Sequence, residues 1–310
     1  MSDTPTVLLS VSSFGVADPA PRDRLEAAGM RIIDNPHGRR LREDEVAELI
    51  VDADAVIAGT EPLSARVLDG ARRLRVISRV GVGLDTVDLN AALRNGIVVR
   101  ITPDALTDSV AELTLSGILN VLRHLGRMDR EMREGVWNRR MGALLRERTV
   151  GIVGLGRIGR RLAELLAPFG CELLASDRAP DESAAARLGV TYVELDELLA
   201  RADVVTLHLP GVGHPIVAAP ELARMKPTAV LVNASRGGLV DEDALLGALR
   251  DETIAGAYLD TFEEEPYEGP LRELPNVLLT PHAGSYAAEA RIRMETEAVE
   301  NMLAALEEFR

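Results

Sequence analysis

Polar residues that could act together in acid–base chemistry follow predicted β-strands in the second half of the chain. Arg236, Asp260 and His282 each come within three residues of the end of an apolar run, and Glu265 lies shortly after Asp260. In an open α/β sheet the carboxyl ends of parallel strands share one edge, where ligands bind. We therefore expect these side chains on the same rim of a parallel sheet.

These residue types fit hydride transfer between an alcohol and a nicotinamide. His282 could exchange the hydroxyl proton, because imidazole titrates near neutral pH. Arg236 could bind a substrate carboxylate through two parallel hydrogen bonds. Glu265, 17 residues before His282, could stabilise the protonated imidazole if the fold pairs them. Taken singly, each also fits an ordinary role: a turn histidine, a solvated Arg-Gly-Gly turn and a solvated acidic run.

A glycine-rich loop near the middle of the chain predicts a dinucleotide site. Residues 154–159 read Gly-Leu-Gly-Arg-Ile-Gly between a short apolar run and an amphipathic run, and Asp177 ends the next predicted strand. Gly154 permits the tight turn, Gly156 lets a pyrophosphate approach the backbone, and Gly159 allows close helix–strand packing. A plain βαβ unit with a glycine turn is the alternative. The order strand, loop, helix, strand and acid favours the dinucleotide fingerprint.

The chain alternates short apolar runs with amphipathic runs over 310 residues, which predicts an α/β fold with two doubly wound parallel-sheet domains. We expect a flavodoxin-like substrate domain at residues 1–101 plus 286–310. A Rossmann NAD domain, residues 102–285, is expected as an insertion. One long amphipathic helix is predicted over residues 108–133, between the two domains.

Composition excludes several classes of function. The formal net charge is −14 and aromatic residues make up 3%, so nucleic acid is not an expected partner. No apolar run is long enough to span a membrane, and the first residues lack the basic segment of a signal peptide. A single cysteine, Cys171, predicts a cytoplasmic protein without disulfides or a metal site. Lys226 is the only lysine, so arginine must bind any anion.

The motifs together resemble those of the D-isomer-specific 2-hydroxyacid dehydrogenases, most closely the short phosphoglycerate dehydrogenase-like branch, over nearly the whole chain. They lie at residues 81–85 (Gly-Val-Gly-Leu-Asp), 111–114 (Ala-Glu-Leu-Thr), 149–159, 233–238, 260–266 and 279–282. The resemblance implies an NAD-dependent oxidoreductase that interconverts a small D-2-hydroxy acid and its 2-keto acid. It also implies that Arg236, Glu265 and His282 are the catalytic residues.

The resemblance further implies that backbone N–H groups near Val82 and Gly83 meet the substrate carboxylate. A homodimer joined through the NAD domains is expected, and no regulatory domain is expected because the sequence ends at Arg310. Asp177 favours NAD over NADP, since a carboxylate repels a 2′-phosphate. The expected cofactor-binding residues are Gly154, Gly156, Arg157, Ile158, Gly159, Asp177, Leu209, Ala234, Ser235, Arg236, Asp260, His282 and Gly284.

The sequence motifs do not define which hydroxy acid is the substrate. Phosphoglycerate dehydrogenases often carry an arginine where residues 58–61 here read Ala-Gly-Thr-Glu, so we hypothesise that Arg39 and Arg40 supply a substitute charge. A solvated basic turn is the alternative for this pair. The alternative functions are a dehydrogenase for a phosphonate or another specialised hydroxy acid, and an NADH-sensing corepressor-like binding protein. Glu265 argues against formate, because formate enzymes typically pair the histidine with glutamine.

Overall fold

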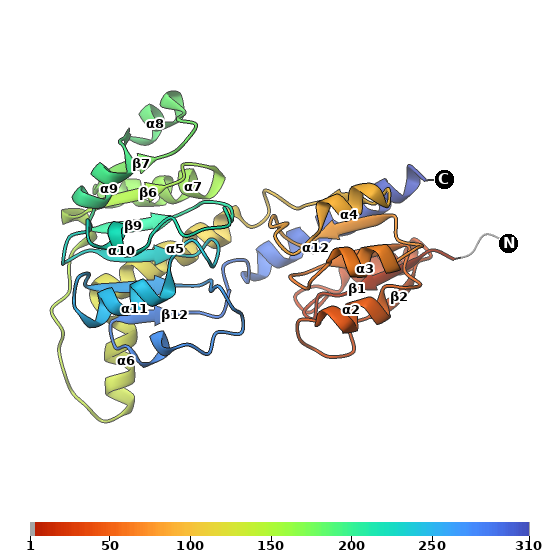
Figure 1. The fold of residues 1–310 in the computed structure, drawn as a ribbon, viewed down its shortest axis with the longest axis horizontal. Helices are drawn as coiled ribbons and strands as arrows, with labels where there is room; N and C mark the ends of the chain where they lie inside the picture. Colours follow the sequence, from red (N-terminus) through yellow and green to blue (C-terminus); the bar gives the residue numbers. More distant parts are fainter. Residues whose placement is uncertain (1–3, 310) are drawn as a thin grey trace. The chain divides into compact units, whose positions relative to one another are not determined.

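The chain forms two compact units in the computed structural model, which describes residues 4–309. The first unit comprises the described parts of Met1–Leu106 and Ser285–Arg310, and the second is Thr107–Gly284. The second unit is thus inserted into the sequence of the first. Figure 1 labels the elements of both units.

The first unit is built on a parallel five-stranded sheet in the order β2-β1-β3-β4-β5. Its strands are β1 (Thr6–Leu9), β2 (Arg31–Asp34), β3 (Ala55–Ala58), β4 (Val76–Arg79) and β5 (Val98–Arg100). Every residue of β1, β3 and β4 is buried, as expected for parallel strands covered on both faces. This strand order is that of the flavodoxin-like fold.

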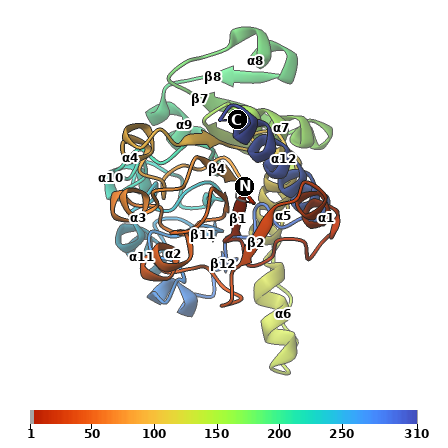
Figure 2. The ribbon, with the colours of Figure 1, turned by 90° about the vertical axis from the view of Figure 1, so that its right-hand side faces the viewer.

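Helices cover both faces of this sheet. They are α1 (Ala20–Ala27), α2 (Glu43–Leu49), α3 (Ala65–Gly70), α4 (Leu89–Arg94) and α12 (Ala288–Glu307). The last helix contacts α1 and the strands β3, β4 and β5. Figure 2 shows α1 and α12 on one side of the sheet and α2, α3 and α4 on the other. The side chains of Ser64 and Asp88 cap the starts of α3 and α4. Each accepts a hydrogen bond from a backbone N–H that has no partner within its helix.

The second unit is built on a parallel seven-stranded sheet in the order β12-β11-β10-β9-β6-β7-β8. Its strands are β6 (Thr149–Val153), β7 (Glu172–Ser176), β8 (Val190–Tyr192), β9 (Val204–Leu207), β10 (Val230–Asn233), β11 (Gly256–Leu259) and β12 (Val277–Leu279). The strand order reverses between β6 and β9, which is the switch point where a Rossmann sheet binds its ligand. The predicted class, two doubly wound parallel sheets, is confirmed.

Two apolar layers flank the second sheet. One contains α5 (Thr107–Arg123), α7 (Arg157–Leu166) and α8 (Glu182–Leu188), and the other contains α9 (Leu195–Arg201), α10 (Ala219–Leu222) and α11 (Glu242–Arg250). Short 3-10 turns lie at Leu145–Glu147, Ala167–Phe169 and Pro270–Glu273. Helix α5 packs so closely on β11 that a Cβ atom on Gly117 would lie 2.0 Å from the ring of Tyr258.

The single long helix predicted over residues 108–133 is wrong. The structure has α5 and a separate helix α6 (Leu125–Arg133), divided at His124, whose φ of 55° is left-handed. The sequence has no proline there to signal the break. The side chain of Asn120 accepts a hydrogen bond from the backbone N–H of Gly126 at 2.9 Å, and this contact stabilises the bend.

Helix α6 stands away from the rest of its unit (Figures 1 and 2) and buries none of its residues. Large apolar side chains are exposed on it and on the segment that follows, namely Leu125, Met132, Val136, Trp137, Met141 and Leu144. Among residues 4–309, no helix is long and apolar enough to cross a membrane.

Candidate active site

The glycine loop lies between β6 and α7 and has the geometry that a dinucleotide loop needs. Gly154 has a φ of 96°, and a Cβ atom on it would lie 2.5 Å from the carbonyl oxygen of His208. A Cβ on Gly159 would lie 2.3 Å from the carbonyl oxygen of Gly154. At Gly156, by contrast, a Cβ would meet nothing within 4 Å. Two glycines are thus needed for packing, and the third leaves the backbone open to a phosphate group.

Helix α7 begins at Arg157, directly after this loop. The first N–H groups of a helix have no partner within it, so they can bind an anion together with the helix dipole. Asp177, at the end of the neighbouring strand β7, accepts hydrogen bonds from the N–H groups of Leu155 at 2.8 Å and Ala179 at 2.9 Å. Its carboxylate therefore fixes the loop, and each oxygen retains a lone pair for a ribose hydroxyl.

The loop after β10 is fixed by Asn233, the last residue of that strand. The Asn233 side chain donates to the carbonyl oxygen of Arg236 at 2.7 Å and accepts from both the N–H and the hydroxyl of Ser235. Arg236 is partly exposed, and its guanidinium donates to the Ser235 carbonyl oxygen at 2.7 Å. The side chain of Asn233 thus shapes the backbone that carries Arg236.

The Arg236 loop packs directly against the loop after β11. A Cβ atom on Gly237 would lie 1.8 Å from the carbonyl oxygen of Phe262, a separation that only glycine permits. The ring of Phe262 stacks on Tyr267 with centroids 4.4 Å apart. Glu265 lies between these two aromatic residues in the sequence, so the stacking and the glycine contact together restrict the loop that carries it.

Glu265 and His282 lie in contact, although they are 17 residues apart in the sequence. The Nδ1 atom of His282 lies 2.9 Å from Oε2 and 3.1 Å from Oε1 of Glu265. Because a carboxylate only accepts, Nδ1 carries the hydrogen in this pair. Both side chains are partly exposed, at 37% for His282 and 26% for Glu265. The Nε2 atom of His282 has no hydrogen-bond partner within residues 4–309 and is the atom open to proton transfer.

The turn that carries His282 is built around the fully buried carboxylate of Asp260. This carboxylate accepts from the Thr280 hydroxyl at 2.5 Å and from the N–H groups of Ala283 and Gly284 at 2.8 Å each. His282 itself has a φ of 53°, an uncommon conformation for a residue with a side chain. Three hydrogen bonds to one buried acid stabilise this conformation.

The other expected cofactor residues follow the same strand ends. Leu209 comes after β9, Ala234 and Ser235 follow β10, and Gly284 follows β12. Ala234, Ser235 and Gly284 are buried, and both backbone polar groups of Gly284 are engaged, with Asp260 and with the Ser109 hydroxyl. His208, just after β9, is also enclosed, and burial lowers its pKa from the usual value near 6.5 to about 4.

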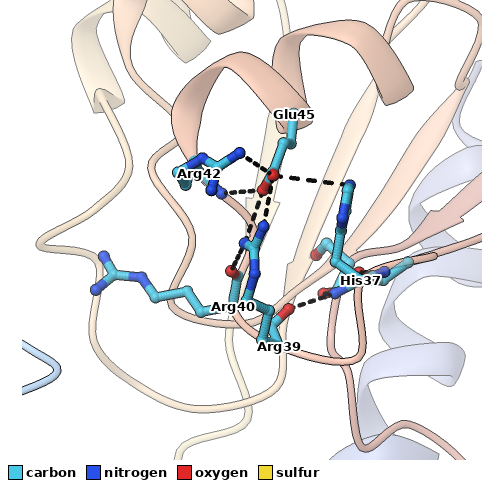
Figure 3. Close-up of polar contacts among 7 residues, drawn as sticks. His37, Arg39, Arg40, Arg42 and Glu45 are labelled. Atoms are coloured by element: carbon cyan, nitrogen blue, oxygen red, sulfur yellow. Dashed lines mark hydrogen bonds and ion pairs between the residues drawn. The ribbon is translucent and has the colours of Figure 1, made fainter.

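In the first unit, the expected substrate residues Val82 and Gly83 lie in the loop after β4 and are partly exposed. Their N–H groups have no acceptor within residues 4–309. The loop after β2 carries Arg39 and Arg40 (Figure 3). The guanidinium of Arg39 is bound to Glu45 by contacts of 2.6 and 2.9 Å, and this pairing, with the Arg42 backbone N–H, lowers the pKa of Glu45 to about 2.

Sequence reasoning missed the residues that hold these loops in place. Asn233 and Thr280 lie inside motifs whose other residues carry the expected chemistry, and only the side-chain contacts reveal their role. Arg79 and Thr102, on either side of the Val82–Gly83 loop, gave no signal of their own. Asn233 and Arg79 share one pattern, a polar residue at the end of a fully buried parallel strand, and such a strand end lies where loops need hydrogen bonds.

Comparison with known proteins defines the class. Residues 115–284 match the model of the D-isomer specific 2-hydroxyacid dehydrogenase NAD-binding domain. The chain is 39% identical over 270 residues to the glyoxylate reductase of Korarchaeum cryptofilum, covering 84% of this chain and 81% of that protein. The chain therefore belongs to the D-isomer-specific 2-hydroxyacid dehydrogenase family, and its second unit is an NAD-binding domain.

Two further relatives extend the comparison. The chain is 35% identical to the D-3-phosphoglycerate dehydrogenase of a Synechocystis species over 97% of its own length but only 56% of that protein. It thus spans about half the length of this phosphoglycerate dehydrogenase. The structure of D-lactate dehydrogenase from Aquifex aeolicus, complexed with NAD and lactic acid, has a TM-score of 0.85 and 27% identity, with 97% of this chain and 95% of that chain covered.

Proposed function

We propose that this protein is an NAD-dependent oxidoreductase that interconverts a small D-2-hydroxy acid and its 2-keto acid. The observation that carries the proposal is the contact between Glu265 and His282 at the carboxyl edge of the NAD-binding sheet. An imidazole whose Nδ1 is fixed by a carboxylate presents Nε2 for proton exchange, an arrangement that general acid–base catalysis requires.

Each residue has a defined task in the reduction. NADH, when bound, supplies the hydride that the keto carbon receives. His282 donates its Nε2 proton to the carbonyl oxygen, so that the product is a neutral alcohol, and it takes the proton back in the oxidation direction. In the second unit, Arg236 is the proposed cation for the substrate carboxylate. In the first unit, the N–H groups of Val82 and Gly83 are the proposed carboxylate-binding groups. Glu265 keeps the imidazole in the correct tautomer.

The cofactor preference follows from Asp177. A carboxylate at the end of the second Rossmann strand accepts hydrogen bonds from the ribose hydroxyls and repels a 2′-phosphate. The residues proposed to hold the cofactor are the thirteen named from the sequence, Gly154 to Gly284, with the glycine loop and the start of α7 binding the pyrophosphate. We expect a clearly higher kcat/KM with NADH than with NADPH, and better turnover with NADPH would contradict this assignment.

A panel of 2-keto acids tests the proposal directly. Purified protein is mixed with NADH and glyoxylate, pyruvate, hydroxypyruvate and 3-phosphohydroxypyruvate in turn, and the loss of NADH absorbance is followed. The expected result is turnover of at least one keto acid that His282→Ala abolishes while NADH still binds. A protein that binds NADH but reduces none of these acids would instead support a sensor function.

The substrate that we favour has no phosphate group. Glu61 stands in the segment after β3, is 2% exposed, and accepts from the Ser10 hydroxyl and the Gly59 N–H. Residues 58–61 therefore contain a buried acid and no cation for a phosphate. Arg39 is bound to Glu45 (Figure 3), which leaves Arg40 as the remaining candidate for a phosphate contact. If Arg40→Ala leaves the KM for 3-phosphohydroxypyruvate unchanged, Arg40 has no such role.

We also propose that the protein is a cytoplasmic homodimer joined through its NAD domain. The support for dimerisation is the exposed apolar surface of α6 and residues 134–144, where Trp137 is 81% and Met141 is 94% exposed, since large apolar patches usually mark interfaces. Light scattering should give twice the chain mass of 33.4 kDa, and Trp137→Glu should shift the mass toward the monomer. The cytoplasmic location is supported by the use of a single cysteine.

A further inference from the structure

A buried arginine lies directly beneath the loop proposed to bind the substrate carboxylate. Arg79 is the last residue of β4 and is only 6% exposed. Its Nε donates a hydrogen bond to the carbonyl oxygen of Gly83 at 2.8 Å. A guanidinium stays charged at any pH at which proteins fold, and burying it is costly unless hydrogen bonds compensate. The hydrogen bond to Gly83 ties this buried guanidinium to the loop.

The other end of the same loop is held by Thr102, which follows β5 and is fully buried. Its hydroxyl accepts from the Gly81 N–H at 2.8 Å, and its own N–H donates to the Gly81 carbonyl oxygen at 3.0 Å. Gly81 has a φ of 141°, which residues with a side chain rarely adopt. The segment Gly81–Val82–Gly83 is thus fixed at both ends by buried side chains of its own unit.

These contacts use the Gly81 N–H and the carbonyl groups of Gly81 and Gly83, and they leave the N–H groups of Val82 and Gly83 available. The carbonyl oxygens of Gly81 and Gly83 are bound by Thr102 and Arg79, whereas the N–H groups of Val82 and Gly83 have no acceptor within residues 4–309. Successive N–H groups without internal partners form a binding place for an anion. The charge of Arg79 on the Gly83 carbonyl favours an anion further, because field lines from a buried charge are poorly screened.

We propose that Arg79, assisted by Thr102, is a positioning residue for the substrate carboxylate. It fixes the orientation of the Val82 and Gly83 peptide groups and adds positive potential, and it acts through the Gly83 carbonyl rather than by contact with the substrate. This inference rests on the proposed function, since it assumes that the acid being bound is a 2-keto or 2-hydroxy acid. It assigns the first unit a charged group for carboxylate recognition.

Steady-state kinetics of Arg79→Met test the proposal with the best keto acid of the panel. Methionine fills a similar volume but cannot donate to Gly83. The KM for the keto acid should rise about tenfold or more, which corresponds to one lost charge-assisted interaction. The KM for NADH and the kcat at saturating keto acid should change less than about threefold. Arg100→Met is the matched control, because Arg100 ends the neighbouring strand β5 but is exposed, and it should leave every constant unchanged.

Two further variants separate positioning from folding. Arg79→Lys retains the charge and should recover part of the lost affinity, which a purely structural role of the arginine does not require. Thr102→Val removes the hydroxyl bound to Gly81 and should also raise the keto-acid KM, so the test stands even if Arg79→Met does not fold. An active wild-type protein whose keto-acid KM is unchanged in the folded variants would overturn the inference alone. A wild-type protein that reduces no keto acid would overturn the proposed function itself, and the inference with it.

Discussion

The His282 turn of the second unit and the Gly81–Val82–Gly83 loop of the first unit are built alike but present different chemistry. Both follow a strand at the carboxyl edge of a parallel sheet, and both are held by buried polar side chains: Asp260 and Thr280 in one, Arg79 and Thr102 in the other. The turn presents a side chain, the imidazole of His282. The loop presents backbone N–H groups.

The charge of the buried anchor differs accordingly. Asp260 is an acid and accepts from N–H groups, so it draws the amides of Ala283 and Gly284 inward. Arg79 is a base and donates to a carbonyl oxygen, so it draws the Gly83 carbonyl inward. An acidic anchor therefore consumes amide groups and a basic anchor leaves them free. Only the second arrangement suits the binding of an anion by the backbone.

The largest expected effect is the loss of kcat when the side chain of His282 is changed. His282→Asn removes the proton donor, and kcat should fall about a thousandfold, within the range for general acid–base catalysis. The dissociation constant for NADH, measured by fluorescence titration, should change far less than kcat, because His282 is only one of the thirteen proposed cofactor residues and the glycine loop is untouched. A variant with wild-type kcat would exclude His282 from proton transfer.

Asp260→Asn weakens the anchor of the His282 turn. An amide cannot accept from the Thr280 hydroxyl and from two N–H groups as a carboxylate does, so a buried donor loses its partner. Unfolding free energy should fall by about 1–3 kcal/mol, and kcat should fall with it because His282 loses its defined backbone conformation. Denaturant titration and kinetics on the same sample measure both. An unchanged kcat in a destabilised variant would show that Asp260 holds the fold but does not position the imidazole.

The glycine loop, like the Gly81–Val82–Gly83 loop, is proposed to bind its ligand through the backbone. Gly156→Ala should leave the melting temperature unchanged, because a Cβ there meets nothing within 4 Å. NADH affinity should fall about tenfold, since the methyl group occupies space that the pyrophosphate needs. Gly247→Ala is the control: Gly247 lies in α11 with the same open surroundings. Equal NADH affinity in the two variants would contradict the assignment of the loop.

The smallest effect concerns His208, a half-buried residue beside the glycine loop, where burial of the imidazole lowers its pKa to about 4. Between pH 6.5 and 4 this histidine binds a proton in the unfolded chain but not in the folded protein. The free energy of unfolding therefore falls as the pH falls through this window. The melting temperature of the wild type should therefore drop more steeply over this window than that of His208→Asn. His214→Asn, at an exposed position, should follow the wild type.

The sequence predicted the features of the candidate site that depend on side-chain type. It predicted only some of the features that depend on backbone conformation. The fold class followed from the βα alternation, and the pairing of His282 with Glu265 followed from their places after strands that turned out to be parallel neighbours. The free amides of Val82 and Gly83 came only from the family resemblance, because a backbone N–H has no letter in a sequence. The break at His124 was missed, because it depends on a side-chain contact from Asn120.

A single comparison of two variants tests the central claim most directly. Rates of NADH oxidation are measured over a wide range of keto-acid concentration for His282→Asn and Arg79→Met. We predict that His282→Asn stays slow at saturating keto acid, whereas Arg79→Met recovers a near wild-type rate once the keto acid is raised. If both variants lose rate at saturation to the same extent, or both recover, then the two regions do not divide proton transfer from carboxylate binding, and the account given for them is wrong.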